Sequence, residues 1–99
     1  MATVTWTQGA LDDLRAIHDF IARDSARAAE ALVERLLTAT ECLASFPESG
    51  RVVPEFPELG YRELIVSSYR VVYRLEGTTV WIIVVVHGRR RLGGESIDV

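Results

Sequence analysis

The side chains best suited to chemistry on a phosphate lie in the second half of the chain. They are one histidine and six arginines: His87, Arg62, Arg70, Arg74, Arg89, Arg90 and Arg91. Metal-independent RNA cleavage needs a base for the 2′-hydroxyl, a cation beside the phosphorane and an acid for the leaving oxygen. Arg70 or Arg62 could hold the phosphate, and His87, whose ordinary pKa is ~6.5, could be the base or the acid. Glu55 or Glu63 could supply the second proton-transfer group.

The same arginines also fit a surface that binds a protein. Arg70 and Arg74 alternate with Val72 on one face of a predicted strand, and such arginines more often form a solvated or partner-binding surface than a catalytic one. A histidine at a strand end, such as His87, is as often a structural hydrogen-bonding group as a catalyst. On the residues alone, both interpretations stay open.

Charge is distributed unevenly along the chain, whose formal net charge is −3. Residues 1–50 carry four arginines against eight acidic residues, whereas residues 61–91 carry six arginines against two. The net charge argues weakly against a protein coated in nucleic acid, and the basic second half predicts a face for an acidic partner. All 11 basic residues are arginines, so no lysine can act as a nucleophile, base or acid.

A chain of 99 residues predicts a single domain, 1–99, with a core at 1–92 and a frayed tail at 93–99. Cys42 is the only cysteine, which excludes an internal disulfide and a multi-cysteine metal site, and we expect neither a metal nor a cofactor. No signal-peptide pattern is visible, and the longest apolar run, 80–86, is far shorter than the ~20 residues of a membrane span. We therefore expect a cytoplasmic protein with no membrane contact.

The elements that must position these side chains begin with a short strand. β-branched and aromatic residues predict a strand at Thr3–Trp6. Apolar residues at three- and four-residue steps then predict two amphipathic helices, one over about 8–24 and a second that ends near Phe46. Asp24-Ser25 between them should supply the side-chain cap of the second helix. Because the turn between them is so short, the helices should form an antiparallel hairpin.

Three strands should follow an irregular segment, 47–60, that holds all three prolines. They are expected at 61–66, 69–76 and 79–87, joined by tight turns. The last strand has a run of apolar residues without alternation, so we expect it to be central and covered on both faces. The element order β-α-α-β-β-β predicts an α+β fold, in which an N-terminal strand and a three-stranded antiparallel meander form one sheet and the helical hairpin covers one face.

Five segments in this order resemble the RelE/ParE superfamily of bacterial toxins. They are A-L-D-D-L-R-A-I-H-D-F-I-A in the first helix, L-A-S-F-P-E-S-G-R at 43–51, R-E-L at 62–64, Y-R-V-V-Y-R at 69–74 and H-G-R-R-R-L at 87–92. The likeness runs from about Thr3 to Leu92. It implies a RelE/ParE-like fold and a role as the toxin of a type II toxin–antitoxin pair, held inactive by an antitoxin whose C-terminal segment wraps it.

The resemblance implies one of two activities. RelE-like members are ribosome-dependent mRNA endonucleases, and one branch uses a Glu–Arg–His set, in which case Arg70 and His87 would be catalytic. ParE-like members bind and inhibit DNA gyrase and would use the arginines to bind the antitoxin or the target. The acidic net charge, the absence of lysine and the absence of a tyrosine after His87 favour a ParE-like toxin that is not an enzyme. The alternatives are a RelE-like endonuclease and a family member that has lost its activity.

Overall fold

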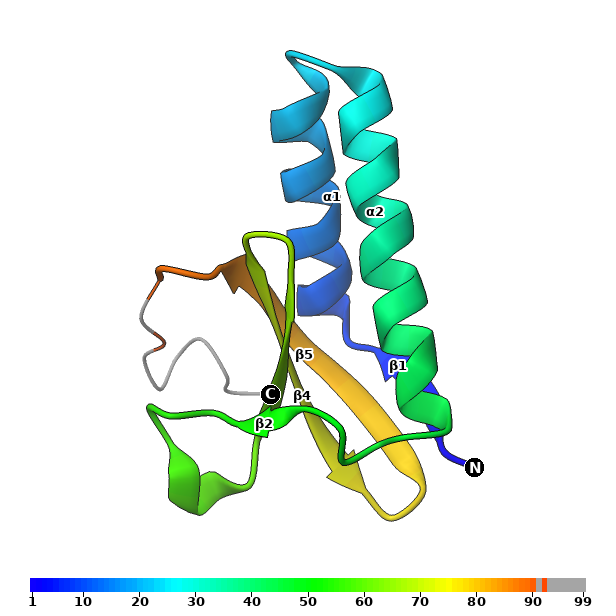
Figure 1. Ribbon diagram of the computed structural model, residues 1–99, viewed down its shortest axis with the longest axis vertical. Helices are drawn as coiled ribbons and strands as arrows, with labels where there is room; N and C mark the ends of the chain where they lie inside the picture. The colour runs from blue at the N-terminus through cyan, green and yellow to red at the C-terminus, as the bar shows by residue number, and fades with distance from the viewer. Residues whose placement is uncertain (91, 93–99) are drawn as a thin grey trace.

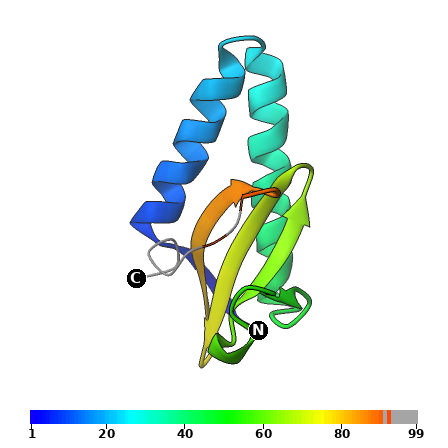
Figure 2. The same cartoon turned by 90° about the vertical axis from the view of Figure 1, so that its left-hand side faces the viewer.

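Two helices and a sheet make up the computed structural model, which describes residues 1–90 and 92 (Figure 1). The helices α1 (Gln8–Ala22) and α2 (Ala26–Glu41) form an antiparallel hairpin against one face of the sheet. The tip of the hairpin extends beyond the strands in both views (Figures 1 and 2). Short 3-10 turns follow at Cys42–Ala44 and Pro57–Leu59. The predicted α+β architecture is confirmed.

The sheet has five strands in the order β1-β5-β4-β3-β2. Their bounds are Thr3–Trp6 for β1, Arg51–Val52 for β2, Arg62–Val66 for β3, Tyr69–Glu76 for β4 and Thr79–His87 for β5. β1 pairs with β5 in parallel, and the remaining neighbours are antiparallel. The four predicted strands are present. β2 is an addition, because the segment expected to be irregular contributes two residues that pair with the start of β3.

Both helices begin at hydroxyl caps. The Ser25 hydroxyl accepts a hydrogen bond from the Ala28 N–H at 3.1 Å, as predicted for an N-cap. Thr7 caps α1 by accepting from the Ala10 N–H, and its hydroxyl also donates to the Ile82 carbonyl at 2.8 Å. The cap of α1 thus also ties the helix to β5.

β5 is covered on both faces, as its apolar run predicts. Val72 pairs with Val84 and Tyr73 with Ile82, so Ile83 is an extra residue, a β-bulge, that puts Ile83 and Val84 on the same face. Apolar residues therefore fill both faces of β5, and the bulge adds one more to the face away from the helices. Beyond the end of β1, the Asp13 carboxylate from α1 accepts the Val85 N–H at 2.9 Å.

The face of the sheet away from the helices has a smaller core of its own. The segment after β2 buries Val53 there, and the chain after β5 buries Leu92, which are 0% and 4% exposed. Both segments therefore cross the face that carries Arg70 and Val72. The predicted frayed tail, 93–99, lies outside the described residues. No helix within the described residues is both long and apolar enough to cross a membrane.

Candidate functional site

Arg70 lies inside the protein, with 4% of its surface exposed. Its Nη1 and Nη2 atoms donate to the two carboxylate oxygens of Glu55, both at 2.7 Å. Its Nε atom donates to Glu63 at 2.7 Å, and Nη2 lies 2.6 Å from the same oxygen. Nη1 also donates to the Arg90 carbonyl at 2.9 Å. Every nitrogen of the guanidinium therefore already contacts a carboxylate.

Glu63 is shared between two arginines. It is 1% exposed, and its second oxygen accepts from the Arg51 Nε at 2.6 Å. We call Arg51, Glu55, Glu63 and Arg70 the charge cluster. The hydrogen bonds from Arg70 lower the pKa of Glu55 to about 2, and the bonds to Glu55 and Glu63 raise the pKa of Arg70 above its ordinary value. At neutral pH Glu55 is therefore ionised and has no proton to donate.

The charge cluster also fastens the chain that follows β5. Glu55 accepts the Leu92 N–H at 3.1 Å, and Arg70 binds the carbonyl of Arg90. The Gly88 N–H donates to the Ser68 carbonyl in the turn between β3 and β4. The cluster thus joins three separate parts of the sequence and sets where Arg89 and Arg90 project.

Exposed arginines surround a hollow of about 330 Å³ beside the charge cluster. Arg51, Arg89 and Arg90 line it together with Arg70 and Glu55, and we call it the basic hollow. Glu55 and Glu63 balance two of these four arginines, so the hollow keeps a net positive charge. Arg51 was not among the residues singled out from the sequence. The only signal for it was its place at the end of the 43–51 segment.

The predicted arginines do not form one surface. Arg62 lies on the helix side of the sheet, where it donates to the Gly50 carbonyl at 2.8 Å, whereas Arg74 lies on the other side, 3.6 Å from Glu76. Arg89 and Arg90 come together with Arg51, and Arg91 lies outside the described residues. The expectation that Arg70 faces solvent or a partner is wrong, because the 51–56 segment and the chain after β5 cover it.

His87 is exposed at the end of β5. Its ring lies edge-on to Tyr69 at a centroid distance of 5.7 Å, and its Nδ1 atom accepts the Arg89 N–H at 3.2 Å. A shallow hollow with Gly88 and Arg89 adjoins it. Arg70 and His87 therefore lie in different environments, because carboxylates enclose Arg70 whereas His87 faces solvent. Among the described residues there is also no group of three or more side chains suited to a metal ion.

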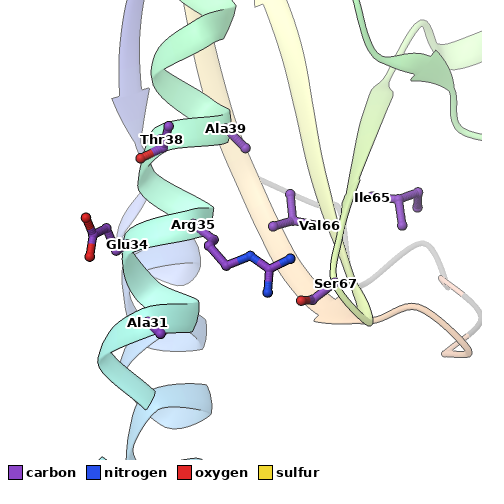
Figure 3. Close-up of a pocket in the computed structure, with 8 residues that line it drawn as sticks. All are labelled: Ala31, Glu34, Arg35, Thr38, Ala39, Ile65, Val66 and Ser67. Atoms are coloured by element: carbon purple, nitrogen blue, oxygen red, sulfur yellow. The ribbon is translucent and has the colours of Figure 1, made fainter. Parts of the chain in front are cut away.

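A second surface lies between α2 and the β3–β4 turn. Figure 3 shows Arg35 reaching from α2 toward Val66 and Ser67 across this groove. β2 pairs only with Arg62 and Glu63. Within the described part of the chain, the end of β3 therefore has a neighbouring strand on one side only. The groove can accept an extended segment of a partner.

The sequence is similar to those of known bacterial toxins. The model of the ParE toxin family, of the type II toxin–antitoxin system parDE, matches residues 4–92. Toxin RelE2 from Caulobacter vibrioides is 40% identical over 91 residues, which cover 91% of this chain and 99% of the relative.

Two solved structures share the fold. A chromosomal ParDE system from P. aeruginosa matches with a TM-score of 0.71 at 23% identity, covering 88% of this chain and 96% of that chain. The toxin–antitoxin complex RelBE2 from Mycobacterium tuberculosis matches with a TM-score of 0.60 at 30% identity, covering 87% and 96%. The chain belongs to the ParE toxin family of the RelE/ParE superfamily, whose members are toxins of type II toxin–antitoxin systems.

Proposed function

We propose that this toxin is a ParE-like inhibitor of DNA gyrase that acts in the cytoplasm and is neutralised by its antitoxin. The observation that carries the proposal is the enclosed guanidinium of Arg70, which contacts Glu55 and Glu63 at 2.6–2.7 Å. In a ribonuclease built on Arg70 and His87, this arginine would bind the phosphate that is cleaved.

A phosphate could reach Arg70 only by displacing Glu55 or Glu63. Displacement would leave an unpaired carboxylate in a buried site, next to an incoming anion of the same sign, and an unpaired buried charge costs several kcal/mol. The site is therefore better suited to holding the fold than to cleaving RNA, and the match to the ParE toxin family supports the same conclusion.

The antitoxin would place an acidic, partly apolar segment on the basic hollow. Arg89 and Arg90 are exposed there beside Arg51, and opposite charges give an interface its orientation and its association rate. Arg89→Ala with Arg90→Ala should weaken antitoxin binding about tenfold, whereas Arg23→Ala with Arg27→Ala on the helices should change it less than about twofold. Equal affinities for the two double variants would rule out this surface.

A RelE-like mRNA endonuclease is the second candidate, because the curated relative at 40% identity is named Toxin RelE2. In that case Arg89 or Arg90, rather than Arg70, would hold the phosphate, and His87, near Arg89, would transfer a proton. The charge cluster would then only support the site.

Expression without the antitoxin separates these candidates. Induced cells are compared for DNA-damage response and for cleavage of mRNA, with antitoxin co-expression as the control. A damage response with intact message is expected. Cleaved message without a damage response would overturn the gyrase proposal in favour of the endonuclease. Normal growth would overturn both and indicate a toxin that has lost its activity.

A further inference from the structure

The side of the helical hairpin that faces away from the sheet carries a groove of about 400 Å³. It lies apart from the basic hollow proposed for the antitoxin, and it shares Glu34 and Thr38 with the groove between α2 and the β3–β4 turn. Val33 and Leu37 of α2 and His18 of α1 are among its lining residues, and Leu37 is 38% exposed. The core side of α2 is formed instead by residues such as Leu32 and Leu36. We call this feature the outer groove.

The spacing of the lining residues suits a helical partner. On α2 they recur at three- and four-residue steps from Glu30 through Val33 and Leu37 to Glu41, which makes one stripe about three turns long. Leu11 of α1 is 41% exposed and lies two turns before His18 on the same side of its helix. A groove between two antiparallel helices with apolar side chains at such steps accepts the apolar face of a third helix.

The charge of the outer groove is one-sided. Glu30, Glu34 and Glu41 line it, and no arginine does. Three arginines lie near the outer groove without lining it: Arg15, between Leu11 and His18 on α1, Arg27, one turn before Glu30, and Arg35, which lines the groove on the other side of α2. Apolar side chains bordered by three carboxylates attract a segment that is both apolar and positively charged.

We propose that the outer groove binds a cationic, amphipathic helix of a protein partner other than the antitoxin. The antitoxin segment proposed above is acidic, so the three glutamates would repel it. A second copy of this chain is disfavoured for the same reason, because a symmetric contact would set these glutamates against their own counterparts. The proposal goes beyond gyrase inhibition and holds whichever activity the toxin has.

The direct test uses a synthetic peptide of about 18 residues with leucines on one helical face and lysines on the other. Its counterpart has glutamate in place of every lysine. Binding to the purified toxin is measured by calorimetry, and the contact surface by changes in backbone amide NMR shifts. The lysine peptide should bind at least about tenfold more tightly than its counterpart, with shift changes centred on Val33, Leu37 and His18.

Two triple variants with the same change of net charge distinguish binding in the outer groove from attraction of the peptide to the negative charge of the whole protein. The first variant combines Glu30→Gln, Glu34→Gln and Glu41→Gln, and it should weaken binding of the lysine peptide about tenfold. The second combines Asp24→Asn, Glu58→Gln and Glu76→Gln, and it should weaken that binding less than about twofold. Leu37→Ser should also weaken it. Equal loss in the two triple variants, or shift changes confined to the sheet, would overturn the proposal. So would a wild-type dimer in sedimentation that Leu37→Glu converts to a monomer, because the groove would then bind a second copy.

Discussion

Replacing Arg70 should destabilise the toxin more than replacing Arg74, the other arginine of β4. In Arg70→Met the methionine fills most of the same space, but Glu55, whose side chain is 10% exposed, loses the cation that it contacts. The fully buried Glu63 loses Arg70 and keeps Arg51. Breaking a buried ion pair from one side costs about 3–5 kcal/mol. A domain of this size has a total stability of roughly 5–15 kcal/mol, so the variant should unfold at a much lower urea concentration.

The matched control is Arg74→Met, two residues along the same strand face. The Arg74 side chain is 33% exposed and lies 3.6 Å from the exposed Glu76, a kind of pair that contributes about 0–1 kcal/mol. Unfolding in urea, followed by the fluorescence of Trp6 and Trp81, measures both variants. Adding Glu55→Gln to Arg70→Met should restore part of the loss, because it removes the carboxylate that lost its cation, whereas Glu63 still contacts Arg51. Two results would refute the stabilising role of the charge cluster. One is an equally small loss of stability in Arg70→Met and Arg74→Met, and the other is no gain of stability from adding Glu55→Gln.

Three further predictions test the structure. The pKa of Glu55 lies at about 2 in the folded protein against an ordinary 4.5, so its contribution, on the order of 3 kcal/mol, should be complete above pH 4.5 and disappear as pH falls toward 2. Urea unfolding at several pH values should show this decline in the wild type and less of it in Glu55→Gln. Gly50→Ala should cost about 1–3 kcal/mol, because the new methyl group would lie 2.6 Å from the Tyr73 hydroxyl and 2.7 Å from the Glu63 carbonyl; an unchanged urea midpoint would contradict that packing. Ser25→Ala should cost about 1 kcal/mol, and Thr7→Ala should cost more, because the Thr7 hydroxyl also binds the Ile82 carbonyl; the reverse order would count against the tie between α1 and β5.

The charge cluster also changes how binding experiments should be designed. A variant that lacks both Arg70 and Arg74 tests folding as much as binding, because Arg70 is buried and Arg74 is partly exposed. Arg89 and Arg90 are exposed at the basic hollow. Their substitution therefore separates the loss of an interface from the loss of the fold.

Local patterns were sufficient to predict most of the fold. The spacing of apolar residues and the capping pair Asp24-Ser25 predicted the helical hairpin, and the uninterrupted apolar run before His87 predicted a central strand. Both are present, with Ser25 as the cap. The alternation of Arg70, Val72 and Arg74 also correctly predicted that the three share one face of the sheet. These features depend on residues within one or two turns of each other, so the sequence reports them directly.

The environment of Arg70 could not be predicted in this way. It depends on Glu55, which lies 15 positions away and reaches Arg70 because a segment with three prolines folds back across the sheet. β2 was missed because two residues are too few to show a period. The bulge at Ile83 was missed because it arises from the pairing register of β4 and β5, which an apolar run does not specify.

The measurement that tests the central claim most directly is the supercoiling activity of purified DNA gyrase with the purified toxin. The account predicts that the toxin inhibits gyrase, that the cognate antitoxin restores gyrase activity, and that Arg89→Ala with Arg90→Ala reduces this rescue. Unchanged gyrase activity in a molar excess of toxin, from a preparation that cleaves mRNA on ribosomes, would contradict it.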